Sequence, residues 1–340
     1  MKQKTILITG ANGEIGHGLI HYVSERYDAQ IIALDVHTID DDLKPRCAKV
    51  VIGDILDNDL IEQLAAQFEF DSIFHLAAVL STKAERQPLL GHKVNVDGTL
   101  NLLAMASEQA RAEEREVKFL YPSSIAVYGL PSIAAKQEAR KVKEEEWLEP
   151  RTMYGINKLY GENLGRYYGH YFRQLDVQPI VGKVDFRAIR FPGLISAHTL
   201  PTGGTSDFAP EMLHQAAKGE PYDCFVRSDA TIPFMAMPDA VRALLMLEEA
   251  PKEGLTKTSY NIGAFSPSAG ELEEHCRKYF PNGKVQFIPD ERRQAIVDSW
   301  PADVDDNAAR RDWKWSPDYG FERAFDDYLV PAVKKRYGKA

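Results

Sequence analysis

Short runs of β-branched and apolar residues alternate with longer stretches of helical apolar spacing over the first half of the chain. The runs predict buried strands at Thr5–Thr9, Ile31–Leu34, Lys49–Ile52, Ser72–Leu76, Val117–Tyr121 and Lys183–Phe191. Between them the spacing predicts helices at Glu14–Arg26, Leu60–Phe68, Val94–Ala110 and Met153–Phe172. Strands that alternate with helices form parallel sheets covered on both faces, so we predict an α/β fold with a Rossmann-type doubly wound parallel sheet.

The pattern changes near residue 194, where prolines and the Gly203-Gly204 pair break the chain into short pieces. We therefore predict a Rossmann domain over residues 1–193 with most of the catalytic residues. Residues 194–340 are predicted to form mainly a smaller substrate-binding lobe, with some segments returning to the Rossmann domain. The charged stretch Ala134–Glu149 is predicted to be a solvated surface helix.

Composition narrows the possible partners. Hydrophobic residues make up 44% of the 340 residues, and 41 Lys+Arg against 50 Asp+Glu give a net charge of -9. This composition is typical of a globular protein and argues against nucleic acid as a partner. Without a long apolar window or a cleavage-like N-terminal segment, we expect a soluble, cytoplasmic protein that does not bind membranes.

Cysteines and histidines predict no metal site. Cys47, Cys224 and Cys276 are odd in number and widely spaced, which favours reduced structural thiols over disulfides or a zinc site. The nine histidines are spread along the chain, and we expect no two of them to lie one turn apart on a helix.

A glycine-rich loop follows the first predicted strand and opens the first predicted helix. In Gly10-Ala11-Asn12-Gly13-Glu14-Ile15-Gly16, the first glycine permits a tight turn, the second lets backbone approach a pyrophosphate, and the third lets the helix pack closely. The free N–H groups and the helix dipole favour a diphosphate. The loop therefore predicts a dinucleotide site, although a glycine-rich turn by itself is a weak signal.

Two carboxylates that follow predicted strands are expected to contact the dinucleotide, and the first of them indicates which dinucleotide binds. Asp35 closes the second strand, where it can bind both ribose hydroxyls, and it would repel a 2′-phosphate. Neither Val36 nor His37 supplies an arginine to offset that repulsion, so we predict NAD rather than NADP as the cofactor. Asp54, after the third strand, is expected at the adenine edge.

Tyr154 and Lys158 stand four residues apart on one predicted helix, so both reach the same ligand. The strand ending at Tyr121 leads into Ser123 and Ser124, at the sheet edge where such folds bind ligands. An unperturbed phenol has a pKa of about 10, and an ammonium about 4 Å away offers roughly the 4 kcal/mol that lowers it by about three units. We predict that Lys158 makes Tyr154 the base that deprotonates an alcohol, which Ser124, with Ser123 beside it, orients.

These residues, with His75-Leu76-Ala77-Ala78 and Asn95, resemble the extended short-chain dehydrogenase/reductase superfamily over about residues 4–195. That superfamily includes nucleotide-sugar epimerases and dehydratases. The resemblance implies cofactor contacts from Tyr154 and Lys158, and from Gly10, Asn12, Gly13, Glu14, Ile15, Gly16, Asp35, Asp54, Ile55, Leu76, Ala77, Ala78, Asn95 and Pro192.

The second half is similar to the NAD-dependent L-threonine 3-dehydrogenases of that superfamily. The likeness rests on the segments at 77–81, 190–207, 232–240 and 293–313. It implies oxidation of the C3 hydroxyl of L-threonine to 2-amino-3-ketobutyrate, with a substrate pocket formed by Ser81, Ser123, Tyr154, Thr205, Ser206 and Trp300. Each has a structural alternative: Ser81 as a helix cap, Thr205 and Ser206 as turn residues, and Trp300 as core. Compared with the family, residues 134–149 and 173–184 look like additions.

Two other functions remain open. A nucleotide-sugar epimerase or dehydratase would use the same Tyr154–Lys158 pair and release NAD unchanged. Leu194–Pro221 contains Lys218 as its one basic side chain besides histidines, which favours a small substrate. A redox sensor that binds NAD without turnover would not need Tyr154, Lys158 and Ser124 together. Apolar side chains on the helix Met153–Phe172 further predict a homodimer packed through that helix.

Overall fold

The computed structural model describes residues 3–177, 181–201 and 203–338. At its centre lies a seven-stranded sheet in which every paired strand is parallel. Its strands are, in spatial order, β3 (Lys49–Ile52), β2 (Ala29–Asp35), β1 (Lys4–Thr9), β4 (Ser72–His75), β5 (Val117–Ser124), β7 (Val184–Phe191) and β11 (Ser259–Asn261). The order reverses between β1 and β4, as in a doubly wound fold, so the predicted fold class is confirmed.

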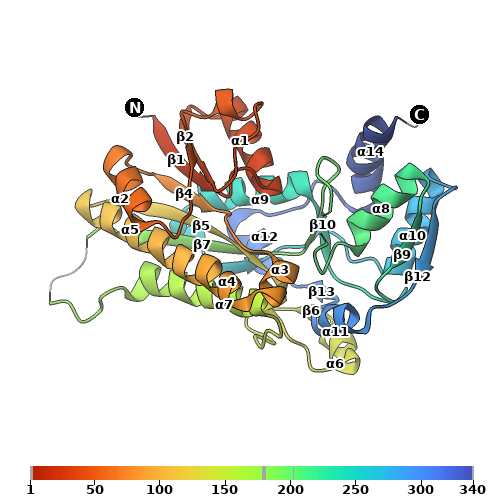
Figure 1. Ribbon diagram of the computed structural model, residues 1–340. Helices are drawn as coiled ribbons and strands as arrows, with labels where there is room; N and C mark the ends of the chain where they lie inside the picture. Colours follow the sequence, from red (N-terminus) through yellow and green to blue (C-terminus); the bar gives the residue numbers. More distant parts are fainter. Residues whose placement is uncertain (1–2, 178–180, 202, 339–340) are drawn as a thin grey trace.

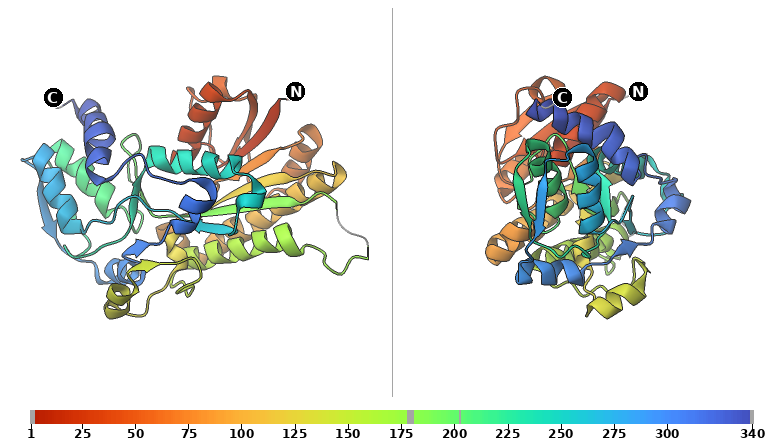
Figure 2. Two further views of the ribbon diagram at one scale, coloured as in Figure 1. Left: turned by 180° about the vertical axis from the view of Figure 1, so that it is seen from behind. Right: turned by 90° about the vertical axis from the view of Figure 1, so that its right-hand side faces the viewer.

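Helices cover both faces of this sheet (Figures 1 and 2). One face carries α1 (Glu14–Arg26), α9 (Met237–Glu249) and α12 (Asn307–Trp313). The other carries α2 (Asn58–Gln67), α5 (Gly98–Ala112) and α7 (Met153–Arg166). Helices α3 (Ser81–Arg86) and α4 (Pro88–His92) lie between α2 and α5 along the chain and pack against α7. Short helical turns are η1 (Lys44–Arg46), η2 (Lys93–Asp97), η3 (Ile125–Val127), η4 (Tyr167–Tyr171) and η5 (Lys252–Gly254).

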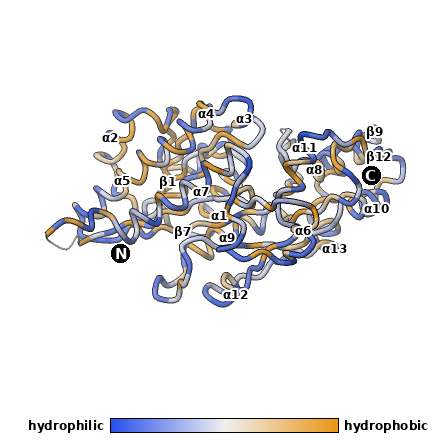
Figure 3. Tube along the Cα trace, turned by 90° about the horizontal axis from the view of Figure 1, so that it is seen from below, coloured by the Kyte–Doolittle hydropathy of each residue, from blue (hydrophilic) through white to orange (hydrophobic). Residues whose placement is uncertain are grey.

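The strand sequences divide between two hydrophobic cores because successive side chains point to opposite faces. On β1, Ile6 and Ile8 join the core beneath α1 and α9, whereas Leu7 joins the core beneath α2 and α5. Figure 3 shows hydrophobic and hydrophilic stretches alternating along α2 and α5, as expected for helices with one buried face. No helix among the described residues is long and apolar enough to cross a membrane.

The smaller lobe is built from short elements around a third core (right side of Figure 1). Its two-stranded pairs are β8 (Gly193–Ile195) with β10 (Phe234–Ala236), β9 (Pro221–Cys224) with β12 (Lys284–Phe287), and β6 (Lys141–Val142) with β13 (Asp303–Val304). Its helices are α6 (Ile133–Ala139), α8 (Phe208–Lys218), α10 (Ala269–Tyr279), α11 (Glu291–Ser299), α13 (Phe321–Arg323), η6 (Ala324–Leu329) and α14 (Val330–Tyr337).

Packing crosses the predicted division at residue 193 in both directions. From the second half, α9 packs on α1, and β11 forms the edge of the large sheet beside β7. From the first half, Ile125 to Val142 contribute buried residues to the core of the smaller lobe. The exact domain boundary therefore stays a prediction.

The charged stretch 134–149 is less exposed than predicted. It does contain α6, but Lys136 is buried and its Nζ donates to the Val297 carbonyl at 2.9 Å. Glu144 is buried as well, and its carboxylate accepts from the Asn261 N–H at 3.2 Å. The expectation of a purely solvated excursion is wrong because both charged side chains find partners more than a hundred residues away. Of the second addition, residues 173–184, positions 178–180 lie outside the described residues.

Candidate active site

The glycine loop lies between β1 and α1, where the first helical turn presents its N–H groups at the carboxyl end of the sheet. Gly10 has φ of +65°, and a Cβ there would lie 2.6 Å from the Ala77 nitrogen. Only glycine fits this turn, because any side chain would meet the backbone that follows β4. The close approach brings the loop and residues 76–78 together, as a dinucleotide site requires.

Asp35 ends β2 beside this loop. Its carboxylate accepts the Asn12 N–H at 3.0 Å and the His37 N–H at 2.9 Å, which fixes its orientation. The neighbouring Val36 side chain is exposed. A carboxylate held here, with Val36 rather than a cation next to it, fits the ribose of NAD and disfavours a 2′-phosphate.

The remaining predicted cofactor residues divide into exposed and buried groups. Asp54 is exposed, whereas Ile55 and Pro192 are buried. Asn95 is buried too, and its amide bonds both backbone groups of Val79, at 2.7 and 2.9 Å. Asn95 thus holds the strand-to-helix segment that carries Leu76, Ala77 and Ala78. In this structure Asn95 holds the backbone of the segment whose residues are predicted to contact the cofactor.

Helix α7 carries the predicted catalytic pair. It begins after Thr152, whose hydroxyl caps the helix by accepting the Gly155 N–H at 3.1 Å. At Gly155 a Cβ would lie 2.0 Å from the Ala126 carbonyl oxygen, so a glycine lets α7 approach η3 closely. Tyr154 and Lys158 then lie together, with the Lys158 Nζ 5.6 Å from the Tyr154 ring centroid.

The electrostatics of the pair differ from the sequence-based expectation. Burial raises the pKa of Tyr154 above its ordinary value, so the prediction that Lys158 lowers it is wrong for this structure. The structure instead perturbs the lysine: burial lowers the pKa of Lys158 to about 7, with Glu162 one turn along acting in the opposite direction. Lys158 is therefore the group of the two whose proton is lost near neutral pH.

The two serines after Tyr121 have different environments. Ser123 is buried, and its hydroxyl donates to the Glu162 carboxylate at 2.5 Å. Ser124 is half-buried and accepts the Ala126 N–H at 3.1 Å, which caps η3 where that turn packs on α7. Ser124 therefore has the more accessible hydroxyl, and Ser123 is part of the support beneath the site.

That support is a buried polar network that the sequence did not indicate. Arg190 on β7 donates to both oxygens of Glu162, at 2.9 and 2.6 Å, and to the Tyr128 hydroxyl at 2.9 Å. Tyr128 in turn donates to Asn261 at 2.7 Å. The network links α7 to β7, to the segment after η3 that carries Tyr128, and to β11. Charges so deeply buried are stable only when paired in this way.

Two segments of the predicted substrate pocket meet. The Ser81 hydroxyl accepts from the Thr205 hydroxyl at 3.3 Å and from its N–H at 3.5 Å, and Ser81 does not cap α3. Ser206 packs toward Gly193, whose added Cβ would lie 3.4 Å from the Ser206 Cβ. Trp300 is buried in the core of the smaller lobe, which agrees with its structural alternative.

Arg293 on α11 is a residue that the sequence analysis missed in this role. Its guanidinium donates to the Gly204 carbonyl at 2.7 Å, next to Thr205. A basic side chain thus reaches the pocket segment from outside Leu194–Pro221. A second contact between the lobes is the hydrogen bond that the Thr199 hydroxyl donates to Glu14, in the first turn of α1.

The histidine expectation also needs correction. His17 and His21 lie one turn apart on α1, and both face Asp42. Their spacing is visible in the sequence once the first helix is assigned.

Comparison with known proteins agrees with this geometry. Residues 6–263 match the NAD dependent epimerase/dehydratase family. The chain is 33% identical over 322 residues to the mitochondrial L-threonine 3-dehydrogenase of Bos taurus, covering 93% of this chain and 79% of the bovine protein.

Solved structures give similar matches. The L-threonine dehydrogenase of Clostridium difficile superposes with a TM-score of 0.86 at 32% identity and covers 99% of each chain. A monomeric L-threonine 3-dehydrogenase from a metagenome superposes with a TM-score of 0.84 at 35% identity, covering 97% of this chain and 99% of its own. Because the family match includes the glycine loop, Asp35 and the Tyr154–Lys158 pair, the chain belongs to the NAD-dependent epimerase/dehydratase family, within the extended short-chain dehydrogenases/reductases.

Proposed function

We propose that this protein is an NAD-dependent L-threonine 3-dehydrogenase. The observation that carries the proposal is the Tyr154–Lys158 pair on α7, next to η3 and Ser124, in a chain whose relatives include L-threonine 3-dehydrogenases. In the proposed reaction L-threonine loses the hydrogen on C3 and the proton of the C3 hydroxyl, and becomes 2-amino-3-ketobutyrate. NAD, when bound, accepts the C3 hydrogen as hydride.

The chain's own residues would handle the proton. Ser124 orients the C3 hydroxyl, and the Tyr154–Lys158 pair receives its proton. Lys158 has a pKa of about 7, so the pair is able to take up that proton near neutrality. Ser81, Thr205 and Ser206 are proposed to surround the rest of the substrate, and the contact of Ser81 with Thr205 supports a shared pocket. Because its ring lies in the core, Trp300 is proposed to shape the pocket from behind.

NAD binding is proposed to use the glycine loop, Asp35, Asp54 and residues 76–78. The strained turn at Gly10 and the fixed Asp35 carboxylate support this assignment. Among the described residues Asp35 has no cation bonded to its carboxylate, only the N–H groups of Asn12 and His37. The proposal therefore includes a preference for NAD over NADP.

A second candidate is a nucleotide-sugar epimerase or dehydratase. Arg293 favours it, because a guanidinium beside the pocket segment suits a diphosphate. The two functions differ in the fate of the cofactor, since only the dehydrogenase accumulates NADH. A redox sensor without turnover would leave no purpose for the pair on α7.

A substrate panel tests the proposal. Purified protein with NAD is given L-threonine, D-threonine, L-serine, 3-hydroxybutyrate or a uridine diphosphate sugar, and NADH is followed by absorbance. We expect the highest kcat/KM with L-threonine. Sugar interconversion without net NADH would replace this function with the second candidate, and NAD binding without any turnover would support the sensor.

The proposal extends to assembly and compartment. Tyr160, Tyr167 and Tyr171 are exposed along α7 and η4, which supports a homodimer through this face. The metagenome relative is described as monomeric, which favours the alternative that this chain is a monomer. A cytoplasmic location stays a prediction, and the bovine relative is named as mitochondrial.

A further inference from the structure

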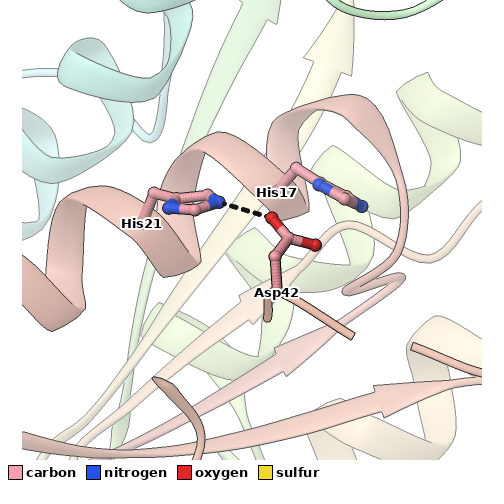
Figure 4. A group of neighbouring side chains, drawn as sticks. All are labelled: His17, His21 and Asp42. Carbon is pink, nitrogen blue, oxygen red and sulfur yellow. Dashed lines mark hydrogen bonds and ion pairs between the residues drawn. The ribbon is translucent and has the colours of Figure 1, made fainter. Parts of the chain in front are cut away.

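A cluster of two histidines and one carboxylate lies outside the proposed active site, between α1 and the segment after β2. One ligand atom from each of His17, His21 and Asp42 lies within 4.8 Å of the others. Figure 4 shows the Asp42 carboxylate next to both imidazole rings, with the His21 Nε2 and an Asp42 oxygen 3.1 Å apart. Asp40, from the same segment, lies 3.3 Å from the His17 Nε2.

We propose that His17, His21 and Asp42 bind one divalent cation of the zinc type. Two imidazoles spaced one helical turn apart lie on the same helix face and are suited to hold such a cation. Imidazole nitrogen favours zinc and neighbouring transition metals over magnesium or calcium, which prefer oxygen. A water molecule completes the tetrahedral set, and Asp40 supplies a second negative charge beside it.

The spacing of the ligand atoms fits this chemistry. In a tetrahedral zinc site with bonds of about 2.0–2.1 Å, ligand atoms lie roughly 3.3–3.4 Å apart. The His21–Asp42 separation of 3.1 Å is already close to that value. The other ligand atoms, which lie up to 4.8 Å apart, can reach tetrahedral spacing by small side-chain rotations, because all three side chains are at least partly exposed.

The backbone that carries the ligands is fixed. Ile39 and Leu43 flank the three aspartates and are buried in the core that also holds Leu19 and Ile20 of α1. The Asp40 N–H donates to the Asn12 side chain at 3.0 Å. The two sides of the site are therefore held in place before a cation arrives, which reduces the entropy lost on binding.

Charge around the site favours a cation. Lys44, two residues along the chain from Asp42, pairs with Asp41 at 2.6 Å. The Asp40 and Asp42 carboxylates lie beside the two imidazoles, so acidic oxygens and ring nitrogens face the same position.

Metal titration tests the proposal without reference to catalysis. Protein stripped with a chelator is dialysed against zinc chloride at neutral pH, and bound zinc is counted by mass spectrometry of the metal. We expect one zinc per chain, at least about 10-fold weaker binding in His17→Ala and in His21→Ala, and no binding under the same conditions with magnesium. The surface variant His170→Ala, on η4, is the matched control and should bind zinc as the natural chain does.

A second measurement separates metal binding from folding defects. Zinc bound across α1 and the 40–42 segment should raise the melting temperature of the natural chain and of His170→Ala, but not of Asp42→Asn. Melting curves without zinc show whether each variant is folded. The proposal is overturned if zinc fails to bind, or if the double variant His17→Ala/His21→Ala binds it with unchanged stoichiometry and affinity. Neither result bears on the proposed dehydrogenase activity.

Discussion

At the scale of single residues, the proposed proton chemistry depends on Lys158. With a pKa of about 7, Lys158 loses its proton as pH rises through neutrality, and in the proposed reaction the Tyr154–Lys158 pair can then accept the proton of the substrate. We therefore expect kcat/KM to be lost as pH falls below about 7, by tenfold per unit, and to level off above.

The variant Lys158→Met should remove this dependence. Only the phenol can then lose a proton, and burial raises the pKa of Tyr154, so activity should keep rising into the alkaline range. At pH 7 we expect a loss of at least about 10²-fold. Steady-state rates across pH measure both effects. An unchanged acid limb in Lys158→Met would show that another group titrates.

Glu162 is expected to affect both the free energy of unfolding and the pKa of Lys158. Its carboxylate pairs with the buried Arg190 and raises the pKa of Lys158 against the effect of burial. Glu162→Gln should cost about 3–5 kcal/mol of unfolding free energy, because Arg190 is left buried without its ionic partner. It should also move the acid limb of kcat/KM to lower pH. Urea unfolding and pH profiles test this against Glu62→Gln, an exposed position on α2 that should be neutral. An acid limb at unchanged pH in Glu162→Gln would contradict the effect of Glu162 on the pKa of Lys158.

At the scale of elements, the placement of α7 decides whether Tyr154 reaches the site. In Gly155→Ala the new methyl group would collide with the Ala126 carbonyl, where the added Cβ would lie 2.0 Å away. We expect the helix to shift, with about 1–3 kcal/mol lost in stability and about 10²-fold in kcat. Gly320→Ala is the matched control, since nothing lies within 4 Å of its added Cβ. Equal kcat in both variants would contradict the close contact.

The elements of the first half were largely predictable, because short apolar runs mark its strands and apolar residues at helical spacing mark its helices. The first predicted strand, Thr5–Thr9, differs from β1 by one residue, and the predicted helix Glu14–Arg26 agrees with α1. The smaller lobe was not predictable in detail. Its strands are two to four residues long, and they pair with partners far along the chain, as β6 does with β13.

Parts of the site were missed for a similar reason. Arg190, Glu162 and Tyr128 are ordinary residues in sequence, and only the fold reveals that they form one buried network. Lys136 and Glu144 looked solvated because their partners, Val297 and Asn261, are remote. Burial also reversed the expected pKa shift of Tyr154, since desolvation cannot be read from a four-residue spacing.

At the scale of the whole molecule, the two lobes meet at the proposed substrate pocket. Ser81 and Thr82 from the large lobe bond Thr205 and Gly203 from the smaller one, and Glu14 receives the Thr199 hydroxyl. Segments that cross between the lobes hold this arrangement together. If this pocket binds the substrate as proposed, specificity should depend on contacts that neither lobe makes alone.

The exposed tyrosines of α7 and η4 lead to a prediction on assembly. We expect sedimentation at micromolar concentration to give twice the chain mass of 38.2 kDa. Tyr160→Glu should yield a monomer, because a charge in the centre of an apolar interface is costly. Ile133→Glu, exposed on α6, should remain a dimer. A monomeric natural chain would contradict the proposed interface and match the metagenome relative.

The most direct test of the proposed chemistry compares the natural chain with Tyr154→Phe in one experiment. NAD affinity is measured by calorimetry, and NADH formed from saturating L-threonine is measured in the same preparations. We expect the variant to bind NAD with nearly unchanged affinity and to form NADH at least about 10²-fold more slowly. Undiminished NADH formation by Tyr154→Phe would contradict the assignment of the base, and no NADH from L-threonine by the natural chain would contradict the function.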